Sequence, residues 1–354
     1  MPGSDLYNQW LTPPVEVHMT FYLFSLKNGA DFEKNGSKPI FEEIGPFVYQ
    51  EIISKEEIVD NYNYTITYKE RRRYRFIQEL SPYEDTYPVT MLNMAPITVI
   101  SGIRYTSGLV HSAVNLALKL TGDTLLVTKP VREVLFLKVL STLDKKLVPS
   151  PMVGLFYGKN DSIDGTYTMF TGADDYRNTG IIQLFNYEPA MSVWSDPYAN
   201  MINGTDGTFA QPFLDETSIV WIFESDLCRS LYANYNKTIK IVDDIEVLGY
   251  SPSEYFFANH SVNPDNAGFC TPAGNCLPAG VLNLTGCVGG VPIIQSCPHF
   301  LFGADKFVND VVGITPNLTQ HQTLIFIEPL TGVPMKANKR IQFNTQLFRD
   351  SRIE

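Results

Sequence analysis

The distribution of the cysteines constrains the fold of this 354-residue chain more than any other feature. None precedes residue 228, and four of the five fall within a 28-residue stretch rich in glycine and proline. Such a group indicates either loops cross-linked by disulfides or a tetrahedral zinc site. Zinc knuckles usually separate paired cysteines by about two to four residues, and spacings of five, ten and nine favour disulfides instead. The five are Cys228, Cys270, Cys276, Cys287 and Cys297, so one thiol is left over.

Eight Asn-x-Ser/Thr sequons are spread from one end of the chain to the other. A sequon accepts a glycan only in a secretory protein and only at the surface, and disulfides also need an oxidising compartment. The alternative is a chance accumulation in an asparagine-rich cytosolic protein. Together the two features predict a lumenal or extracellular glycoprotein. The candidate glycosylation sites are Asn35, Asn63, Asn160, Asn203, Asn236, Asn259, Asn283 and Asn317.

The composition is that of an ordered, acidic protein with few charged residues. Hydrophobic residues make up 44% and aromatic residues 12%, which excludes disorder for most of the chain. Charged residues reach only 18%, against about 25% in an average globular protein, and glycans would supply the missing surface polarity. The net charge of −11 argues against a general nucleic-acid-binding protein. No run of about 18 apolar residues occurs, so no membrane-spanning segment is predicted within the sequence.

Alternating patterns predict β-structure on both sides of a helical middle. Residues 15–80 contain two such patterns, and residues 152–350 return to short strands separated by turns. Five basic residues in 69–75 indicate the exposed face and end of a strand or, alternatively, a binding patch. The alternating apolar positions are Val17, Met19, Phe21 and Leu23, then Tyr62, Tyr64, Ile66 and Tyr68.

Residues 102–147 follow a helical period instead. Gly122 and Asp123 interrupt the pattern, and a second helix is predicted from Pro130 through Leu135 to about Leu147. The sequence therefore predicts a helical hairpin within a β protein. In the first helix, the expected apolar stripe is Leu109, Ala113, Leu116 and Leu120, and the expected polar stripe is His111, Asn115 and Lys119.

The predicted helical region differs in charge from the rest of the chain. Residues 102–150 contain seven basic and three acidic residues, a net charge of +4, so the remainder carries −15. A cationic end on an anionic body could steer an anionic ligand. The alternative is a solvated helical face that happens to use lysine.

Established catalytic and metal-binding patterns do not occur in the sequence. It contains no Gly-x-Ser-x-Gly elbow, His-Glu-x-x-His, phosphate-binding loop or Gly-x-Gly-x-x-Gly. The five histidines show no metal-ligand spacing, and Asp174-Asp175 and Asp243-Asp244 lie among turn residues. We therefore expect a binding protein and not an enzyme, with no metal and no cofactor.

Several motifs, in order along nearly the whole chain, resemble those of class B scavenger receptor ectodomains. The segments DNAGFC and GVLNLTGC, with Asn275-Cys276 between them, are most similar to the lysosomal integral membrane protein branch of that family. The other motifs are Trp10, FYLFSLKN (21–28), GPFVYQE (45–51), VGLFYGKN (153–160), DGTYTMFTG (164–172), MINGTDG (201–207), SDLCRS (225–230), NPDNAGFC (263–270), PHFLFGAD (298–305) and IEPLTGVPM (327–335).

The resemblance implies an α+β, mainly β fold. Its core would be an antiparallel β-barrel with short helices and an apical helical bundle, formed here by a cap over residues 102–150 inside one ectodomain of residues 1–354. It also implies two membrane anchors outside this chain and a place in the plasma membrane or the lysosome. The bulk of the chain would be extracellular or lumenal, and the final strands of such ectodomains would lie beyond its end.

The resemblance further implies a receptor that binds anionic lipids, sterols or lipoproteins at the cap and passes lipid through an internal hydrophobic tunnel. The alternative is a sorting receptor whose cap binds a lysosomal acid hydrolase. In that case His111 is either an acid-sensitive contact or an ordinary surface histidine. Relatives carry Trp-Gly-Tyr after Arg-Glu-Leu, whereas here Arg132–Val134 leads into Leu135, so ligand identity does not carry over.

Residue positions that match the family imply two disulfides, Cys228–Cys287 and Cys270–Cys276, with Cys297 free or partnered elsewhere. The resemblance places anionic ligands beside Lys119. The cap residues proposed to contact ligand are His111, Asn115, Lys119, Lys129, Arg132 and Lys138.

Overall fold

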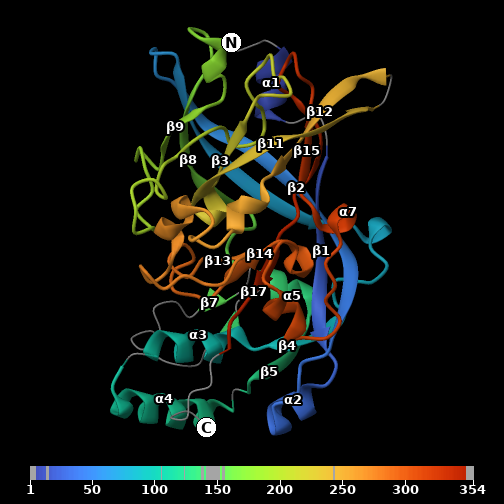
Figure 1. Ribbon diagram of the computed structural model, residues 1–354, viewed down its shortest axis with the longest axis vertical. Helices are drawn as coiled ribbons and strands as arrows, with labels where there is room; N and C mark the ends of the chain where they lie inside the picture. Colours follow the sequence, from blue (N-terminus) through green and yellow to red (C-terminus); the bar gives the residue numbers. More distant parts are fainter. Residues whose placement is uncertain are drawn as a thin grey trace.

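Two five-stranded antiparallel sheets form most of the protein (Figure 1). The computed structural model describes residues 5–12, 16–104, 106–122, 124–136, 139–140, 152–153, 156–241 and 244–347. The first sheet has the order β1 (Val17–Leu26), β2 (Phe41–Asp60), β3 (Thr65–Phe76), β8 (Ser162–Phe170) and β9 (Ile182–Phe185). The second has the order β10 (Val220–Glu224), β11 (Arg229–Lys240), β12 (Glu246–Pro252), β15 (Leu324–Ile327) and β16 (Pro334–Asn338).

Three smaller antiparallel units complete the β-structure. A three-stranded sheet joins β13 (Val281–Asn283), β14 (Ile294–Ser296) and β17 (Gln342–Asn344). Two ribbons pair β4 (Pro88–Leu92) with β5 (Leu126–Pro130) and β6 (Val139–Leu140) with β7 (Met152–Val153). The mainly β, antiparallel prediction is confirmed. The strands form separate curved sheets in the described part of the chain, and not the one barrel that was expected.

The edge strand β1 confirms its predicted alternation. Met19, Phe21 and Leu23 pack against a buried cluster that includes Phe47 and Tyr49 of β2. The register of β1 against β2 shifts between Phe21 and Leu23. Opposite this bulge, Gly45 has φ +155°, and a Cβ there would lie 2.8 Å from the Phe21 carbonyl oxygen. Only glycine allows the two backbones to approach this closely.

The strand predicted from the second alternating pattern, Tyr62 to Tyr68, begins too early. Strand β3 begins at Thr65, whereas Tyr62 and Tyr64 are exposed and both have positive φ, in the connection between β2 and β3. Ile66 and Tyr68 are buried as expected. Alternation alone could not distinguish the connection from the strand, because tyrosine is common in both exposed and buried positions.

Helices gather at the end of the molecule opposite α1 (Asp5–Leu11) and the N-terminus (Figure 1). Helix α3 (Met94–Ile103) and helix α4 (Gly108–Thr121) pack together through Val99, Ile103, Val114 and Leu118. The limits of α4 confirm the first predicted helix, which ends at Gly122 in the left-handed conformation. The other short helices are α2 (Gly29–Asn35), α5 (Val131–Phe136), α6 (Asp305–Asn309) and α7 (Leu318–His321).

The second predicted helix is confirmed at Val131–Phe136 and is wrong at Val139–Leu140. Helix α5 ends at Phe136, and Val139–Leu140 is a strand that pairs with β7. Just before α5, the β-branched residues Val127 and Thr128 pair with β4 as part of β5. Residues 141–151 lie outside the described residues, as does Lys138. In this region the described residues form a pair of packed helices with α5 nearby, and not a clear bundle.

Candidate functional site

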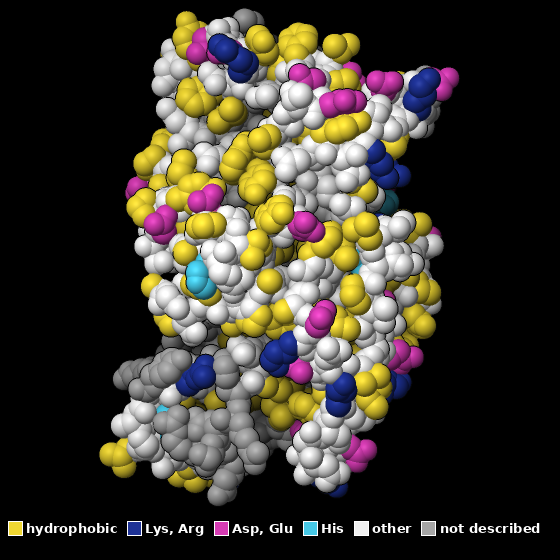
Figure 2. Space-filling model, viewed as in Figure 1, with side chains coloured by type: hydrophobic (Ala, Val, Ile, Leu, Met, Phe, Trp, Pro, Cys, Tyr) yellow, Lys and Arg dark blue, Asp and Glu magenta, His cyan; other side chains and the backbone are white. Residues whose placement is uncertain are grey.

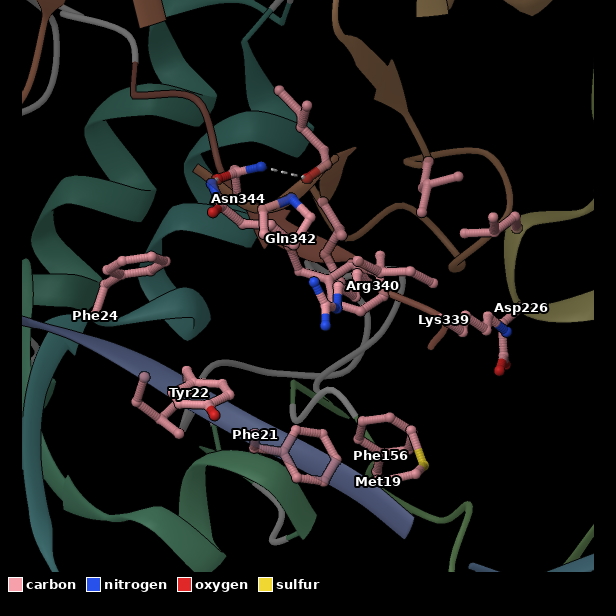
Figure 3. A pocket seen from close by; sticks show the side chains of 18 of the residues that line it. Met19, Phe21, Tyr22, Phe24, Phe156, Asp226, Lys339, Arg340, Gln342 and Asn344 are labelled. Carbon is pink, nitrogen blue, oxygen red and sulfur yellow. Dashed lines mark hydrogen bonds between the residues drawn. The ribbon is translucent and has the colours of Figure 1, made fainter. Parts of the chain in front are cut away.

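One cavity of about 2680 Å³ is lined by residues of both large sheets and of the three-stranded sheet. Its apolar wall includes Met19 and Phe21 of β1 together with Phe156, and the Phe21 and Phe156 rings lie edge to face with centroids 5.4 Å apart (Figure 3). The β4–β5 ribbon extends this wall with Val89 and Met91. Aliphatic and aromatic walls around a large volume suit hydrocarbon chains.

A group of charged side chains crosses the cavity, and we call it the charge belt. Its central cation is Arg72 of β3, whose guanidinium is only slightly exposed. The guanidinium contacts Glu70 at 2.8 Å, Asp226 at 3.3 Å and Asp164 at 3.4 Å. The belt consists of Glu51, Glu70, Arg72, Lys159, Asp164, Glu224, Asp226 and Lys339, all of which line the cavity except Asp164.

Two lysines complete the belt. Lys159 lies just before β8, the strand that pairs with β3. Lys159 pairs with Asp226, and Lys339, which follows β16, pairs with Glu224 at the end of β10. Figure 3 shows Lys339 beside Asp226. The lysine side chains are 42% and 50% accessible, compared with 18% for Arg72. Their ammonium groups thus face open cavity, whereas Arg72 is held within the framework.

Burial and the belt cations have opposite effects on the belt carboxylates. Burial raises the pKa of Glu51 and of Glu70, although Arg72 lowers both. Burial alone would also raise the pKa of Asp226, but Lys159 and Arg72 outweigh it and the pKa is lowered.

Sequence reasoning placed the basic run of residues 69–75 on an exposed face, and this is wrong for Arg72. Lys69, Arg71 and Arg73 do face outward and pair with surface acids. The inward row of β3 is Tyr68, Glu70, Arg72 and Tyr74, so the two charged residues alternate with the outward basic ones. Tyr74 at i+2 and Tyr68 at i−4 from Arg72 were the available signal.

A pair of histidines on the cavity wall was not predicted either. The rings of His299 and His321 stack with centroids 4.1 Å apart. His299 Nδ1 accepts the backbone N–H of Thr315, and Nε2 lies 3.2 Å from a Glu43 carboxylate oxygen. This hydrogen bond with His299 lowers the pKa of Glu43. The pair ties β2 to the C-terminal third of the chain beside the cavity.

The leucines of α4 that were expected to be buried are exposed, and the histidine that was expected on its polar face is buried. His111 is only 1% exposed, and its Nδ1 donates a hydrogen bond to the carbonyl oxygen of Ser107, so it lies inside the α3–α4 contact and not on the surface. Leu109, Leu116 and Leu120, expected to be buried, are 84%, 60% and 79% exposed. We call these three the leucine stripe. Hydrophobic side chains protrude over α4 in Figure 2.

The remaining proposed cap residues lie on different elements. Asn115 is half-buried on α4, and Lys119 is exposed on the same helix. Lys129 of β5 lines the cavity and lies 3.6 Å from Glu133. Arg132 is exposed on α5. Their role in ligand binding stays a prediction.

The cysteines pair as the resemblance implied. Disulfides join Cys228 to Cys287 and Cys270 to Cys276, and Cys297 is free. Burial raises the pKa of Cys297 to about 11, so it is a neutral thiol at physiological pH. In the described residues, the one group with metal-like geometry is His260 with Cys270 and Cys276. Both sulfurs are in a disulfide and do not act as thiolate ligands.

The sequon asparagines are all at least partly accessible, and glycosylation itself stays a prediction. The Asn283 Nδ2 donates a hydrogen bond to the Thr271 carbonyl oxygen at 3.2 Å, and a glycan there would leave one N–H for that bond. The exposed sites are Asn35, Asn63, Asn160, Asn236 and Asn317, and the half-buried sites are Asn203, Asn259 and Asn283.

No described helix is long and apolar enough to cross a membrane. The sequence matches the CD36 family over residues 1–354. It is 34% identical over 349 residues to lysosome membrane protein 2 of Rattus norvegicus and 35% identical over 352 residues to that of Homo sapiens. These alignments cover 97% of this chain and 72% and 71% of the relatives. Scavenger receptor class B member 1 of Rattus norvegicus is 30% identical over 353 residues, 97% of this chain and 68% of that protein.

Proposed function

The chain belongs to the CD36 family, the class B scavenger receptors, which are membrane receptors and not enzymes, and we propose that it binds lipids or lipoproteins at its helical end and passes lipid along the internal cavity. Anchors outside this chain would hold it at the plasma membrane or the lysosomal membrane. The observation that carries the proposal is the cavity of about 2680 Å³ with its wall of aliphatic and aromatic side chains. A volume of this size could hold several acyl chains, and each buried CH₂ is worth about 0.8 kcal/mol.

The proposal is tested by the lipid that the purified protein retains. We expect sterol, phospholipid or fatty acyl lipid to be extracted with it, because the apolar wall stabilises hydrocarbon. Met19 lies on that wall (Figure 3), so Met19→Glu places a charge there and should reduce the retained lipid several-fold. Val262→Glu is the control, since Val262 is exposed and does not line the cavity. Equal lipid content in the three proteins would contradict the proposal.

The leucine stripe supplies the docking surface in this proposal. A leucine transferred from water to an apolar surface gains about 1.5–3 kcal/mol, so three leucines can anchor the helical end in a lipoprotein shell or an apolar partner face. Basic residues Lys119, Lys129 and Arg132 would add attraction for anionic head groups, which weakens as salt is raised.

We expect the triple variant Leu109→Gln, Leu116→Gln, Leu120→Gln to lose affinity for immobilised lipoprotein particles by about tenfold or more. Glutamine is a good helix former, so the melting temperature should stay close to that of the unmodified protein. The control replaces the same leucines with methionine, which keeps the apolar area, and should bind normally. Unchanged capture by the glutamine variant would remove the stripe from the docking surface.

A second candidate is a sorting receptor that binds an acid hydrolase through the same helical end. The leucine stripe favours it as well, because exposed apolar patches are typical of protein interfaces. The similarity to lysosome membrane protein 2 adds support. This function would be favoured over lipid transfer if the leucine stripe captures hydrolase but not lipoprotein and the purified protein retains no lipid.

A further inference from the structure

The charge belt separates two hydrophobic regions of the interior. Along the inward row of β3, Tyr74 belongs to the buried cluster around Phe47, and Tyr68 belongs to the cluster around Trp10. Arg72 and Glu70 occupy the two positions between them. Inward neighbours on a strand are about 6.8 Å apart, so the charged section is on the order of 10 Å deep. Lipid that occupies the cavity lies against this section, since Glu70 and Arg72 both line the cavity.

The belt holds more negative than positive charge. Its five carboxylates belong to Glu51, Glu70, Asp164, Glu224 and Asp226, and its three cations belong to Arg72, Lys159 and Lys339. Each cation already contacts at least one belt carboxylate. A carboxylate that entered would be repelled by this excess of negative charge unless it displaced one of these partners, and a displaced partner would be left buried with its charge uncompensated, which is costly.

An uncharged head group meets no such penalty. A hydroxyl or ester oxygen can accept a hydrogen bond from Lys159 or Lys339 while the ion pairs stay in place, since each ammonium has three donors. The accessibility of these two lysines provides the space for that contact.

We propose that the charge belt selects lipids with uncharged head groups and excludes lipids that carry a free carboxylate. The proposal rests on the lipid-transfer function given above. It assigns Glu224 and Asp226 a specific task, which is to occupy Lys339 and Lys159 so that neither lysine is available to an anionic lipid.

The experiment compares a fluorescent polyene fatty acid with its own methyl ester at pH 7.4, because the two differ only in the charged group. The unmodified protein should bind the ester at least tenfold more tightly than the acid. Glu224→Gln removes the partner of Lys339 and should strengthen binding of the acid about tenfold, with little effect on the ester. Adding Lys339→Met to Glu224→Gln should restore the original preference, because no unpaired cation remains.

The outcomes separate the selectivity from the underlying function. If the unmodified protein binds the ester but binds the acid equally well or more tightly, the charge belt is not a filter, and the lipid-transfer function is unaffected. An unchanged ratio in Glu224→Gln also overturns the filter. Failure of the unmodified protein to bind either probe overturns lipid transfer, and the filter with it. The comparison in the unmodified protein does not depend on the folding of any variant.

Discussion

Replacing Arg72 by methionine is expected to lower the free energy of unfolding by about 3–5 kcal/mol at pH 7.5. The guanidinium contacts Glu70, Asp164 and Asp226, and its removal leaves buried carboxylates without their central cation. Methionine keeps the apolar stem of the side chain, so loss of packing contributes little. The measurement is urea unfolding followed by tryptophan fluorescence.

The loss of stability in the Arg72→Met variant should depend on pH in a defined direction. Burial raises the folded-state pKa of Glu51 and Glu70, so the folded protein binds more protons than the unfolded chain at pH values above the ordinary pKa of glutamate. In that window, stability falls as pH rises. Without Arg72 the pKa values of Glu51 and Glu70 rise further. The difference in free energy of unfolding between the Arg72→Met variant and the unmodified protein should therefore become smaller as pH falls from 7.5 to 5.

Arg73→Met is the matched control. Arg73 is the next residue, is half-exposed, and contacts Asp161 at the surface. An exposed ion pair is worth about 1 kcal/mol or less, so this variant should unfold close to the unmodified protein and show no added pH dependence. Equal effects of the two substitutions would contradict a buried role for Arg72.

Loss of the Cys228–Cys287 disulfide is expected to cost about 4 kcal/mol in the double variant Cys228→Ser, Cys287→Ser. The bond closes a segment with a sequence separation of 59, and the loop-entropy relation gives about 4 kcal/mol for that length. Cys228 is also buried next to Trp194, whose indole N–H donates to the Cys228 carbonyl oxygen at 2.6 Å. A shift of the urea midpoint measures the effect.

The second disulfide provides the comparison. Cys270 and Cys276 are only six residues apart, and the same relation gives about 2 kcal/mol for Cys270→Ser with Cys276→Ser. The first double variant should therefore unfold at the lower urea concentration. The reverse order would mean that strain or residual structure in the unfolded chain, and not loop length, governs these bonds.

Local pattern predicted some elements well. The alternation of residues 17–23 marked an edge strand whose bulky side chains face the interior, and the spacing of 109–120 marked α4 with Gly122 as its end. Both depend on interactions between residues close in the sequence. The disulfide pairing came from the family resemblance, because spacing could not choose between the possible partners.

The orientation of α4 could not be predicted in the same way. Its sequence offers two apolar stripes, one through Leu109, Leu116 and Leu120 and another through Val114 and Leu118. Which stripe is buried depends on Val99 and Ile103 of α3. Packing against that separate helix decides the face, and helical period alone carries no information about it.

The charge belt depends even more on long-range contacts. Arg72 pairs with Asp164 and Asp226, which lie 92 and 154 positions further along the chain. Five basic residues in a short run normally indicate a solvated surface, and only the strand alternation with its flanking tyrosines marks one of them as internal. Asp164 lies on β8, the strand next to β3, and Asp226 follows β10 of the second large sheet, so strand pairing and sheet packing bring both to Arg72.

The central claim is that the cavity holds lipid, and the most direct measurement is quantitative mass spectrometry of lipid extracted from the purified protein. Lipid should be present at one or more molecules per protein, reduced several-fold by Met19→Glu and unchanged by Val262→Glu. The account would be contradicted if folded protein that binds lipoprotein particles yields no more lipid than the Met19→Glu variant.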